Sequence, residues 1–237
     1  MHRIIVKGIL PALLLAAVLP VTPARAQPVP VEQAMPDFTL PILQGGSWQL
    51  SAQKGKRVLL VFPRGLAGEN WCHICNYQYA ELVELEQQGA LRQRFDLEVV
   101  FVLPYDRTKV EDWVAKFPAQ LTDIQNWKNP AEPDKLDDRG RRAMERYRSL
   151  FPKEYRYQEG QVPTPFPILI DADRALSRRL GLFTENWNGA QWEQNIPTVF
   201  LLDREGVVQF KYHSQNTADR PNTAYLVRVL QRLMNDR

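Results

Sequence analysis

The sequence predicts an α/β fold in which a central, mixed sheet is flanked by helices. Short apolar runs rich in β-branched residues, the pattern of strands buried on both faces, alternate along the chain with segments of helical periodicity. Strands that alternate with helices are typical of a layered domain with a mainly parallel sheet. Only a short turn separates the last two predicted strands, so these two must pair antiparallel.

The domain is expected to begin with a β-hairpin. Its strands are predicted over residues 37–43 and 48–50, and Gly45 and Gly46 supply the turn. The preceding residues 27–36 are rich in proline and lack periodicity, which indicates an extended linker.

A β-α-β unit follows the hairpin. Residues 57–62, Arg-Val-Leu-Leu-Val-Phe, predict a strand buried on both faces, and residues 97–103 predict a second one. Between them a loop leads to Trp71-Cys72, where a long helix is expected to begin.

Residues 118–165 differ in composition from the rest of the chain. They are polar, interrupted by prolines and dense in charge. A short helix over 110–117 is expected to end at Pro118, and a second helix is predicted over 137–151 with one of its two leading aspartates as N-cap. Acids alternate with the bases of this second helix, which favours a solvated face over a nucleic-acid patch.

The remaining elements complete the alternation. We expect a strand over residues 166–171 and a helix over 175–180 that ends at Gly181. Two strands follow over 197–203 and 207–212, and an amphipathic helix over 222–234.

The charge balance excludes a polyanion-binding protein. The chain carries 30 Lys+Arg against 27 Asp+Glu, a net charge of +3. All three excess bases, Arg3, Lys7 and Arg25, lie in the first 26 residues, so the remainder is neutral. We therefore expect no nucleic-acid partner.

Residues 1–26 have the pattern of a signal peptide. A basic start and an apolar run precede the sequence Ala24-Arg25-Ala26, which is typical of a cleavage site. The apolar run holds about 14 residues, whereas a membrane span needs roughly 20. We expect cleavage after Ala26, export to a bacterial periplasm and no stable membrane insertion afterwards.

Cys72 and Cys75 are the only cysteines, and their spacing indicates redox chemistry. A structural disulfide gains stability by closing a long loop, and a Cys-x-x-Cys loop closes almost nothing. A zinc site needs about four ligands, and outside the leader only His73 and His213 could join the two thiols. We expect no metal and no cofactor.

The position of the pair at a helix N-terminus assigns a role to each thiol. The helix dipole should lower the pKa of Cys72 and make it the attacking thiolate. Cys75, one turn deeper, would then resolve the mixed disulfide. His73, if protonated, would stabilise the thiolate; alternatively it is a solvated bystander.

Several motifs resemble the thioredoxin-like superfamily, most closely its exported branch that joins TlpA-type disulfide reductases with AhpC/TSA redoxins. They are Trp71-Cys-x-x-Cys between a strand and a helix, Asp37-Phe-Thr-Leu, Gly55-Lys56, Phe62-Pro-Arg-Gly65, and Ile196-Pro-Thr-Val-Phe-Leu-Leu-Asp203. The resemblance covers residues 35–117 and 166–235. It implies a thioredoxin-like domain over 37–237 with an insertion over 118–165.

The resemblance also implies site residues and partners. Pro197 would be the family's cis-proline facing the cysteine pair, and Ile196 would offer backbone groups to a bound partner. Trp71 and His73 would shape the same surface. Partners would be protein thiols or disulfides, or a small thiol, and the protein would be a monomer.

The sequence departs from that family in three ways. His-Ile replaces the usual Gly-Pro between the cysteines, and the sequence shows no obvious buried acid as proton acceptor for Cys75: Glu69 and Glu81 are candidates, and the alternative is that both are ordinary surface carboxylates. The peroxidase pattern places a hydroxyl residue three positions before the cysteine; here Glu69 precedes Cys72 at that spacing, and Cys72 precedes Cys75. Arg64 is expected near the thiolate.

The sequence leaves three hypotheses for the function of the protein. The leading hypothesis is an exported thiol–disulfide oxidoreductase with Cys72 and Cys75 as catalytic residues. The first alternative is a thiol peroxidase of the AhpC/TSA type, with antioxidant activity. The second is a copper-binding chaperone that uses the two thiols and His213. The aromatic residues of the 118–165 insertion either dock a partner or pack the insertion onto the domain.

Overall fold

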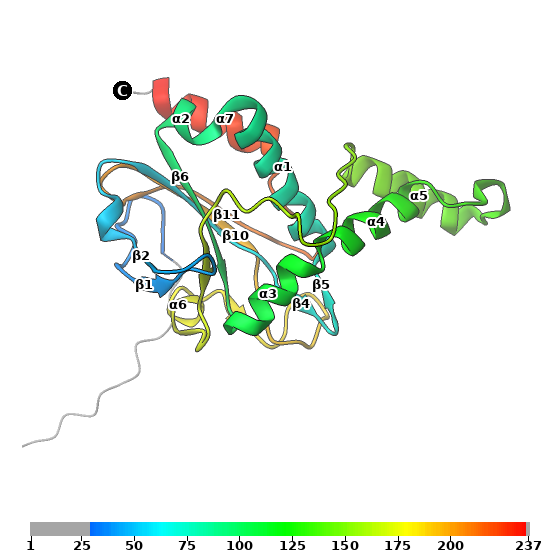
Figure 1. Cartoon of the computed structure of the whole chain (residues 1–237), viewed down its shortest axis with the longest axis horizontal. Helices are drawn as coiled ribbons and strands as arrows, with labels where there is room; N and C mark the ends of the chain where they lie inside the picture. Colours follow the sequence, from blue (N-terminus) through cyan, green and yellow to red (C-terminus); the bar gives the residue numbers. More distant parts are fainter. Residues whose placement is uncertain (1–28, 236–237) are drawn as a thin grey trace, which may run out of the picture.

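A five-stranded mixed sheet forms the centre of the protein (Figure 1). The computed structural model describes residues 29–235, so the signal peptide expected over 1–26 lies outside the described part. The strand order is β11-β10-β3-β6-β7. The bounds are β3 Arg57–Phe62, β6 Leu97–Leu103, β7 Ile168–Ile170, β10 Thr198–Leu202 and β11 Val208–His213. β3, β6 and β7 are parallel, whereas β10 is antiparallel to both of its neighbours. The predicted α/β class is confirmed.

Helices and a hairpin cover the two faces of the sheet. Alternate residues of β3 point to opposite faces, and every one of them is buried. Leu59 and Val61 join a core with side chains of α1, α2, α3 and α7, and Leu60 joins a second core with α6 and the hairpin. These elements are α1 His73–Gly89, α2 Leu91–Phe95, α3 Arg107–Ala115, α6 Ala175–Arg179, α7 Thr223–Asn235, β1 Thr39–Pro41 and β2 Ser47–Gln49.

The described part of the expected linker is fixed to the domain. Val29 and Met35 are buried in the core beneath the hairpin. The backbone of Glu32 donates to Val208, and that of Met35 donates to Gly206. The segment is extended, as its prolines indicate, but it packs along the start of β11 instead of forming a free connection.

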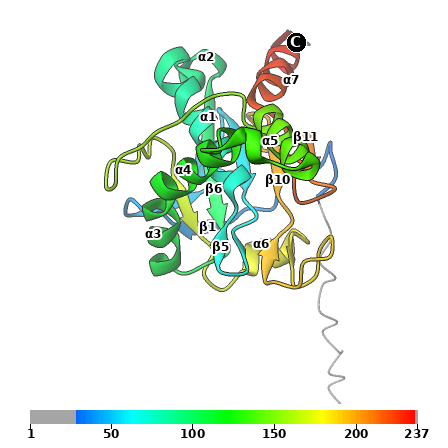
Figure 2. The ribbon, with the colours of Figure 1, turned by 90° about the vertical axis from the view of Figure 1, so that its right-hand side faces the viewer.

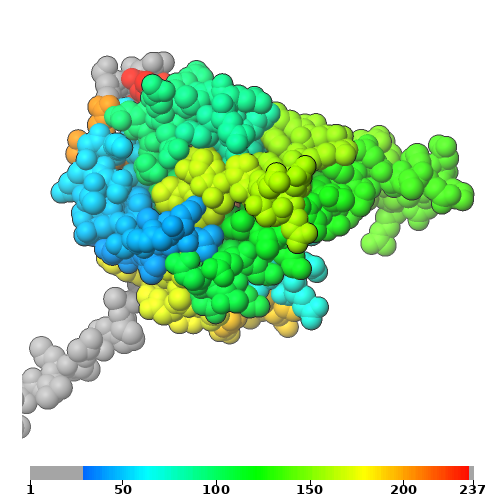
Figure 3. Space-filling model, in the orientation of Figure 1, coloured from blue at the N-terminus to red at the C-terminus, as the bar shows by residue number. Residues whose placement is uncertain are grey.

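The 118–165 insertion builds an arm that projects from the body (Figures 1 and 3). The arm, residues 117–150, consists of α4 Phe117–Lys128 and α5 Asp138–Leu150. The expectation that Pro118 ends a helix is wrong: Pro118 lies in the first turn of α4, where its missing N–H needs no partner. The N-cap of α5 is confirmed as Asp137, whose carboxylate accepts from the backbone N–H of Gly140 at 2.7 Å.

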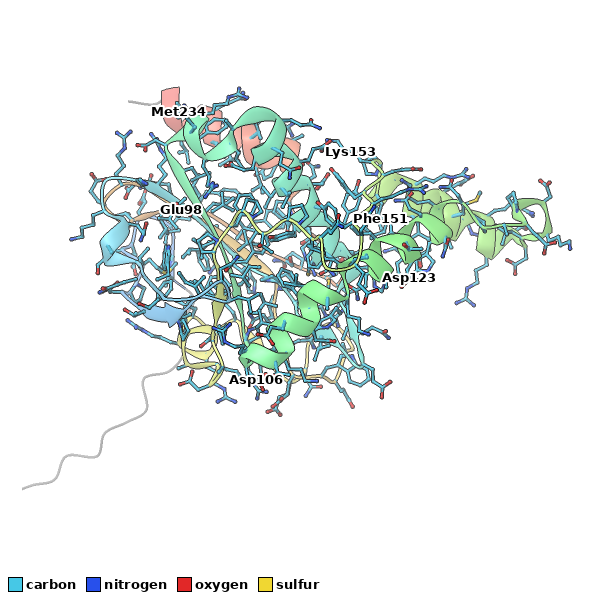
Figure 4. All side chains as sticks on the ribbon, in the orientation of Figure 1. Glu98, Asp106, Asp123, Phe151, Lys153 and Met234 are labelled. Carbon is cyan, nitrogen blue, oxygen red and sulfur yellow. The ribbon has the colours of Figure 1, made fainter. Side chains whose placement is uncertain are left out.

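A small aromatic and aliphatic cluster attaches the arm to α1. Tyr77 and Ala80 of α1 pack there against Leu121 and Ile124 of α4 and against Phe151. Figure 4 shows Phe151 and Asp123 at the base of the arm. Phe151 therefore packs the insertion onto the domain, which is one of the two roles expected for its aromatic residues.

Short elements complete the structure. Two small hairpins lie near the sheet, together with two single turns of 3-10 helix: β4 Leu66–Ala67, β5 Asn70–Trp71, β8 Phe183–Thr184, β9 Gln194–Asn195, η1 Ser51–Gln53 and η2 Pro133–Lys135. Within residues 29–235, no helix has the length and apolar character that a bilayer crossing requires.

Candidate functional site

The cysteine pair lies where the loop after β3 enters α1. Cys72 is the N-cap residue of α1, and the backbone N–H groups of Cys75 and Asn76 both donate to its carbonyl, at 3.0 and 3.1 Å. The backbone N–H of Cys72 in turn donates to the carbonyl of Gly65 at 3.0 Å. The predicted start of the helix is confirmed, and hydrogen bonds of Cys72 connect the first turn both to the preceding loop and to the helix itself.

The loop before Cys72 passes very close to the ring of Tyr105 at Gly65. This residue has φ +84°, and a Cβ atom there would lie 2.4 Å from the hydroxyl oxygen of Tyr105. The Tyr105 hydroxyl accepts from the backbone N–H of Leu66 at 2.8 Å. Only glycine combines the positive φ with this approach, so Gly65 and Tyr105 together set the path of the chain toward Cys72.

No disulfide bond joins Cys72 and Cys75, and their sulfur atoms lie 2.8 Å apart. Cys75 is 1% exposed and Cys72 is 7% exposed. A cavity of about 660 Å³ opens beside Cys72 but not beside Cys75. The structure therefore brings the pair within bridging reach and presents only Cys72 to a partner.

Arg220 supplies the cation of the site. Its Nη2 atom lies 3.5 Å from both sulfur atoms. Its Nη1 atom donates to the carbonyl of Asp219 at 2.6 Å and to the hydroxyl of Ser214 at 3.4 Å, which holds the guanidinium in place. Sequence reasoning missed this residue, because a lone arginine before the last helix gives no signal by itself.

Arg64 contributes through its backbone. Its N–H donates to the sulfur of Cys75 at 3.3 Å. Its side chain turns elsewhere: Nε donates to Gln194 at 2.6 Å, and the guanidinium lies 5.8 Å from the ring centre of Trp187. The expectation that Arg64 lies near the thiolate is correct for its main chain. The contacts of its side chain with the β8–β9 hairpin were not predicted from the sequence.

The acidic member of the pair is Cys75, and the expected low pKa of Cys72 is wrong. Burial raises the pKa of Cys75, but the hydrogen bond with Cys72, the Arg220 guanidinium and the Arg64 N–H lower it to about 5. The hydrogen bond with Cys75, then burial, raise the pKa of Cys72 well above its ordinary value. The Arg220 guanidinium lies equally close to both sulfur atoms, whereas the Arg64 N–H reaches only Cys75 and favours the inner thiolate. The pair thus holds one negative charge and one proton.

The side chain of Trp71 is buried in the core beneath the loop that precedes Cys72, with 2% of the residue exposed. The indole N–H donates to the carboxylate of Asp112 at 2.7 Å, and the ring meets Tyr105 edge to face at 5.3 Å. Only part of it lines the cavity.

A buried amide network joins the cysteine loop to the arm. The indole of Trp113 donates to the side-chain oxygen of Asn76 at 2.7 Å. The amide nitrogen of Asn76 donates to Gln120, whose own amide nitrogen donates to the carbonyl of Trp71 at 2.8 Å. Buried amides need such partners, so the first turn of α1 and the first turn of α4 hold each other. Sequence reasoning missed both amides.

His73 is directed toward the arm. Its Nε2 atom lies 3.2 Å from a carboxylate oxygen of Asp123, and its ring centre lies 4.4 Å from that of Trp127. The contacts of the sulfur atoms are made by Arg220 and Arg64, so the expected role of His73 as thiolate partner is not what this geometry provides.

The Ile196–Pro197 bond is trans, which corrects the expectation of a cis-proline: the described residues contain no cis peptide bond. Trans is the more stable isomer for any X–Pro bond unless the surroundings enforce cis. The N–H of Ile196 already donates to Leu182 at 2.7 Å, and its carbonyl accepts from the hydroxyl of Thr198 at 2.9 Å. Ile196 therefore has no free N–H to offer.

Pro197 reaches the cysteine pair through other residues. Its carbonyl accepts from the N–H of Ser214 at 3.0 Å, and the Ser214 hydroxyl accepts from Arg220. Pro197 is therefore connected to the two thiols through Ser214 and Arg220.

The other candidate residues lie apart from the sulfur atoms. Glu69 is exposed at the turn between β4 and β5. Glu81 is buried on α1, and burial raises its pKa to about 7, but its neighbours are Lys153 and Thr223. The Nδ1 atom of His213 lies 2.8 Å from the hydroxyl of Thr198. Across residues 29–235, no group of three or more His, Cys, Asp or Glu gathers in a way that could hold a metal ion.

Comparisons with known proteins agree with this fold and show the family. The family model described as AhpC/TSA family matches residues 31–211. Similar solved structures include a reduced 2-Cys peroxiredoxin of Plasmodium vivax, with TM-score 0.53 and 14% identity over 88% of this chain and 83% of that one. A thiol peroxidase from Chromobacterium violaceum has TM-score 0.52 and 13% identity over 88% and 90%. A Cys-to-Ser mutant of peroxiredoxin 6 of Arenicola marina has TM-score 0.56 and 11% identity over 87% and 74%. No curated protein matches the chain.

Proposed function

The chain belongs to the AhpC/TSA family, and from that premise we propose that it is an exported thiol–disulfide oxidoreductase. Its Cys72–Cys75 pair would exchange disulfides with protein thiols or a small thiol. One observation carries this proposal: two sulfur atoms that no disulfide joins lie 2.8 Å apart under a single guanidinium, and only one of them borders a cavity.

The first step is attack by Cys72, because Cys75 is too buried to meet a partner. The resting pair holds its proton on Cys72, whose pKa is the higher. That proton passes across the 2.8 Å between the sulfur atoms to Cys75. The Cys72 thiolate then forms a bond to one sulfur of the partner's disulfide, whose S–S bond breaks, and the departing sulfur takes the proton from Cys75.

The second step closes the protein's own disulfide. The Cys75 thiolate, stabilised by Arg220, attacks the sulfur of Cys72 and displaces the second partner sulfur, which takes a proton from solvent. The partner's disulfide has gained two electrons and two protons, and the protein's two thiols have become a disulfide. Every step is reversible, so the reduction potential decides the net direction.

Trapping tests this assignment. In a Cys75→Ser variant, incubation with a disulfide should leave a stable mixed disulfide on Cys72, visible as added mass on the intact protein. The wild-type protein should release the partner and lose two hydrogens. A Cys72→Ser variant is the matched control and should trap nothing. If neither variant forms an adduct, the exchange function is wrong.

Export is part of the proposal and is supported by the leader pattern of residues 1–26. Expression of the full chain in a Gram-negative host should give a periplasmic protein whose N-terminus is Gln27. Recovery of uncleaved protein in the cytoplasm would count against export.

A thiol peroxidase is the second candidate, and the low pKa of Cys75 favours it. A thiolate held by Arg220 and the Arg64 N–H could attack a peroxide oxygen, release an alcohol or water and become a sulfenic acid. Cys72 would then form the disulfide and release water. Stopped-flow mixing of the reduced protein with hydrogen peroxide distinguishes the two: a rate constant no higher than that of a free thiol removes the peroxidase.

A further inference from the structure

A groove runs from Cys72 along the inner side of α5. The cavity of about 660 Å³ is bounded on one side by the start of α1, with Cys72 and Ile74, and on the other side by α5. Figure 2 looks along the arm and shows α5 beside α4 at the front of the molecule. The arm that carries α5 projects from the body (Figure 3).

Three arginines of α5 line this groove: Arg139, Arg142 and Arg146. Their spacing places them on one face of the helix, about 4.5 and 6 Å apart along its axis. Arg64 also borders the cavity, but its guanidinium is bound to Gln194. No Asp or Glu lines the cavity, although the remainder of the chain after the leader is neutral.

This arginine face is unfavourable for the isolated helix. Arg142 and Arg146 are four residues apart, and Arg139 and Arg142 are three apart, spacings at which like charges repel. The acid at the start of α5, Asp138, pairs with Arg141 on another face. Among the described residues, none of the three forms an ion pair. All three are exposed, so packing does not explain them either.

The same cavity has an apolar lining. Ile74 of α1, Trp127 of α4, and Leu150 and Phe151 at the end of α5 border it. An occupant complementary to this mixed lining carries both anionic and apolar groups, with a sulfur atom that can reach Cys72.

We propose that the groove binds an extended, acidic segment of a protein substrate next to its reactive cysteine. Side chains on one side of an extended chain recur about every 6.6 Å, near the roughly 6 Å between Arg142 and Arg146, and the side chains between them face the other way, so that one segment can offer both acidic and apolar groups. A polypeptide is the occupant that carries acidic side chains, apolar side chains and a cysteine on one backbone. The inference rests on the proposed exchange function and adds no chemical step to it: the groove selects the partner and raises the encounter rate.

The test uses the full chain, reduced, and three peptides of equal length. Each carries one cysteine as a mixed disulfide with thiopyridine, so that attack by Cys72 releases the same chromophore. Alternate positions beside the cysteine hold Asp or Glu in the first peptide, Asn or Gln in the second and Lys in the third. We expect the acidic peptide to react about tenfold faster than the amide peptide at low salt, the Lys peptide to react slowest, and added salt to remove the difference.

The variant R139Q/R142Q/R146Q should bring the acidic and amide peptides within about twofold of each other. Its midpoint of urea unfolding and its thiolate absorbance against pH should equal those of the wild type, which shows that fold and thiols are intact. The matched control R94Q/R156Q/R178Q removes three exposed arginines outside the groove and should keep the wild-type preference.

The outcomes separate the two proposals. If no peptide reacts faster than with a free thiol, the exchange function fails. If all three peptides react equally fast, or the groove variant keeps the preference, exchange stands and the acidic-segment inference is wrong. Oxidised glutathione, a small anionic disulfide, is the fourth probe. If the groove variant slows it as much as the acidic peptide, the groove binds small thiols and the commitment to a polypeptide is overturned.

Discussion

The guanidinium of Arg220 lies 3.5 Å from the sulfur of Cys75, although 145 positions separate the two residues in the sequence. The same nitrogen lies 3.5 Å from the sulfur of Cys72. Neither residue between the cysteines supplies a charge to the sulfur atoms; the cation comes from the turn before the last helix. It stabilises the reduced, anionic pair, and a stabilised reduced form makes the corresponding disulfide a stronger oxidant.

Removing this cation should raise the first pKa of the pair. An Arg220→Met variant keeps an apolar stem but loses the charge, and we expect an increase of roughly one to two pH units. The reduction potential should become more negative by roughly 30 mV for each unit, since one unit is about 1.4 kcal/mol. Thiolate absorbance against pH and a redox titration measure the two effects. Arg178→Met, which removes an exposed arginine from α6, is the control; equal shifts in both variants would contradict the assignment.

The wild-type protein should show one thiolate per chain over a wide pH range. The first should form near pH 5, where Cys75 titrates, and the second only well above pH 9, because the pKa of Cys72 is raised. A free thiol has a pKa of about 8.5, so the Cys75 contribution to stability is full above that pH and is lost as the pH falls through 5. Absence of any thiolate below pH 8 would count against the site as described.

Glu81 should destabilise the fold at alkaline pH. Burial raises its pKa to about 7, and the charge of Lys153 and a hydrogen bond with Thr223 offset this only in part. A raised folded pKa means that stability falls as the pH rises from about 4.5 to 7. Glu81→Gln should therefore increase the free energy of unfolding by about 1–3 kcal/mol at pH 8 and leave it unchanged at pH 4.

Glu84, one turn away, is the control of opposite sign. Hydrogen bonds from Lys153 and Tyr155 outweigh burial and lower its pKa. Glu84→Gln should thus decrease stability at pH 8. Urea unfolding at both pH values measures the stability of the two variants. If both substitutions change the free energy of unfolding in the same direction at pH 8, the opposite pKa shifts of Glu81 and Glu84 are wrong.

The close approach at Gly65 should be sensitive to a single methyl group. Gly65→Ala places a Cβ atom 2.4 Å from the hydroxyl oxygen of Tyr105, in a backbone conformation that alanine also disfavours. Gly46→Ala shares the positive φ but meets no atom within 4 Å. We expect Gly65→Ala to cost at least about 1 kcal/mol more than Gly46→Ala and to slow attack by Cys72. Equal unfolding free energies for the two variants would contradict the packing described.

The sheet and the thiol pair could be predicted because their signals are local. The run from Arg57 to Phe62 is apolar at nearly every position, which only a strand buried on both faces requires. Cys72 and Cys75 lie three positions apart, and their neighbours in sequence are also their neighbours in space. Pro118 was ambiguous, since a proline fits both the position after a helix and the first turn of the next one.

The electrostatics of the site could not be read from the sequence. Tertiary structure alone brings Arg220 to both sulfur atoms and the Arg64 N–H to Cys75, and only the second contact distinguishes the two thiols. The resemblance placed Trp71 on the docking surface; its side chain lies mostly in the core, where the indole donates to Asp112, and it also borders the cavity beside Cys72. The arginines of α5 could be counted in the sequence, whereas their place beside the same cavity as Cys72 depends on how the arm is attached.

The most direct measurement is the redox equilibrium of the Cys72–Cys75 pair. The protein is equilibrated in a series of dithiol buffers of known potential, the thiols are alkylated rapidly, and the intact mass is measured. We expect a single two-electron transition between dithiol and intramolecular disulfide, with a midpoint in the range of roughly −270 to −120 mV. A protein that stays in the dithiol form across that range, or that reaches only a mixed disulfide on Cys72, would contradict a reversible exchange couple.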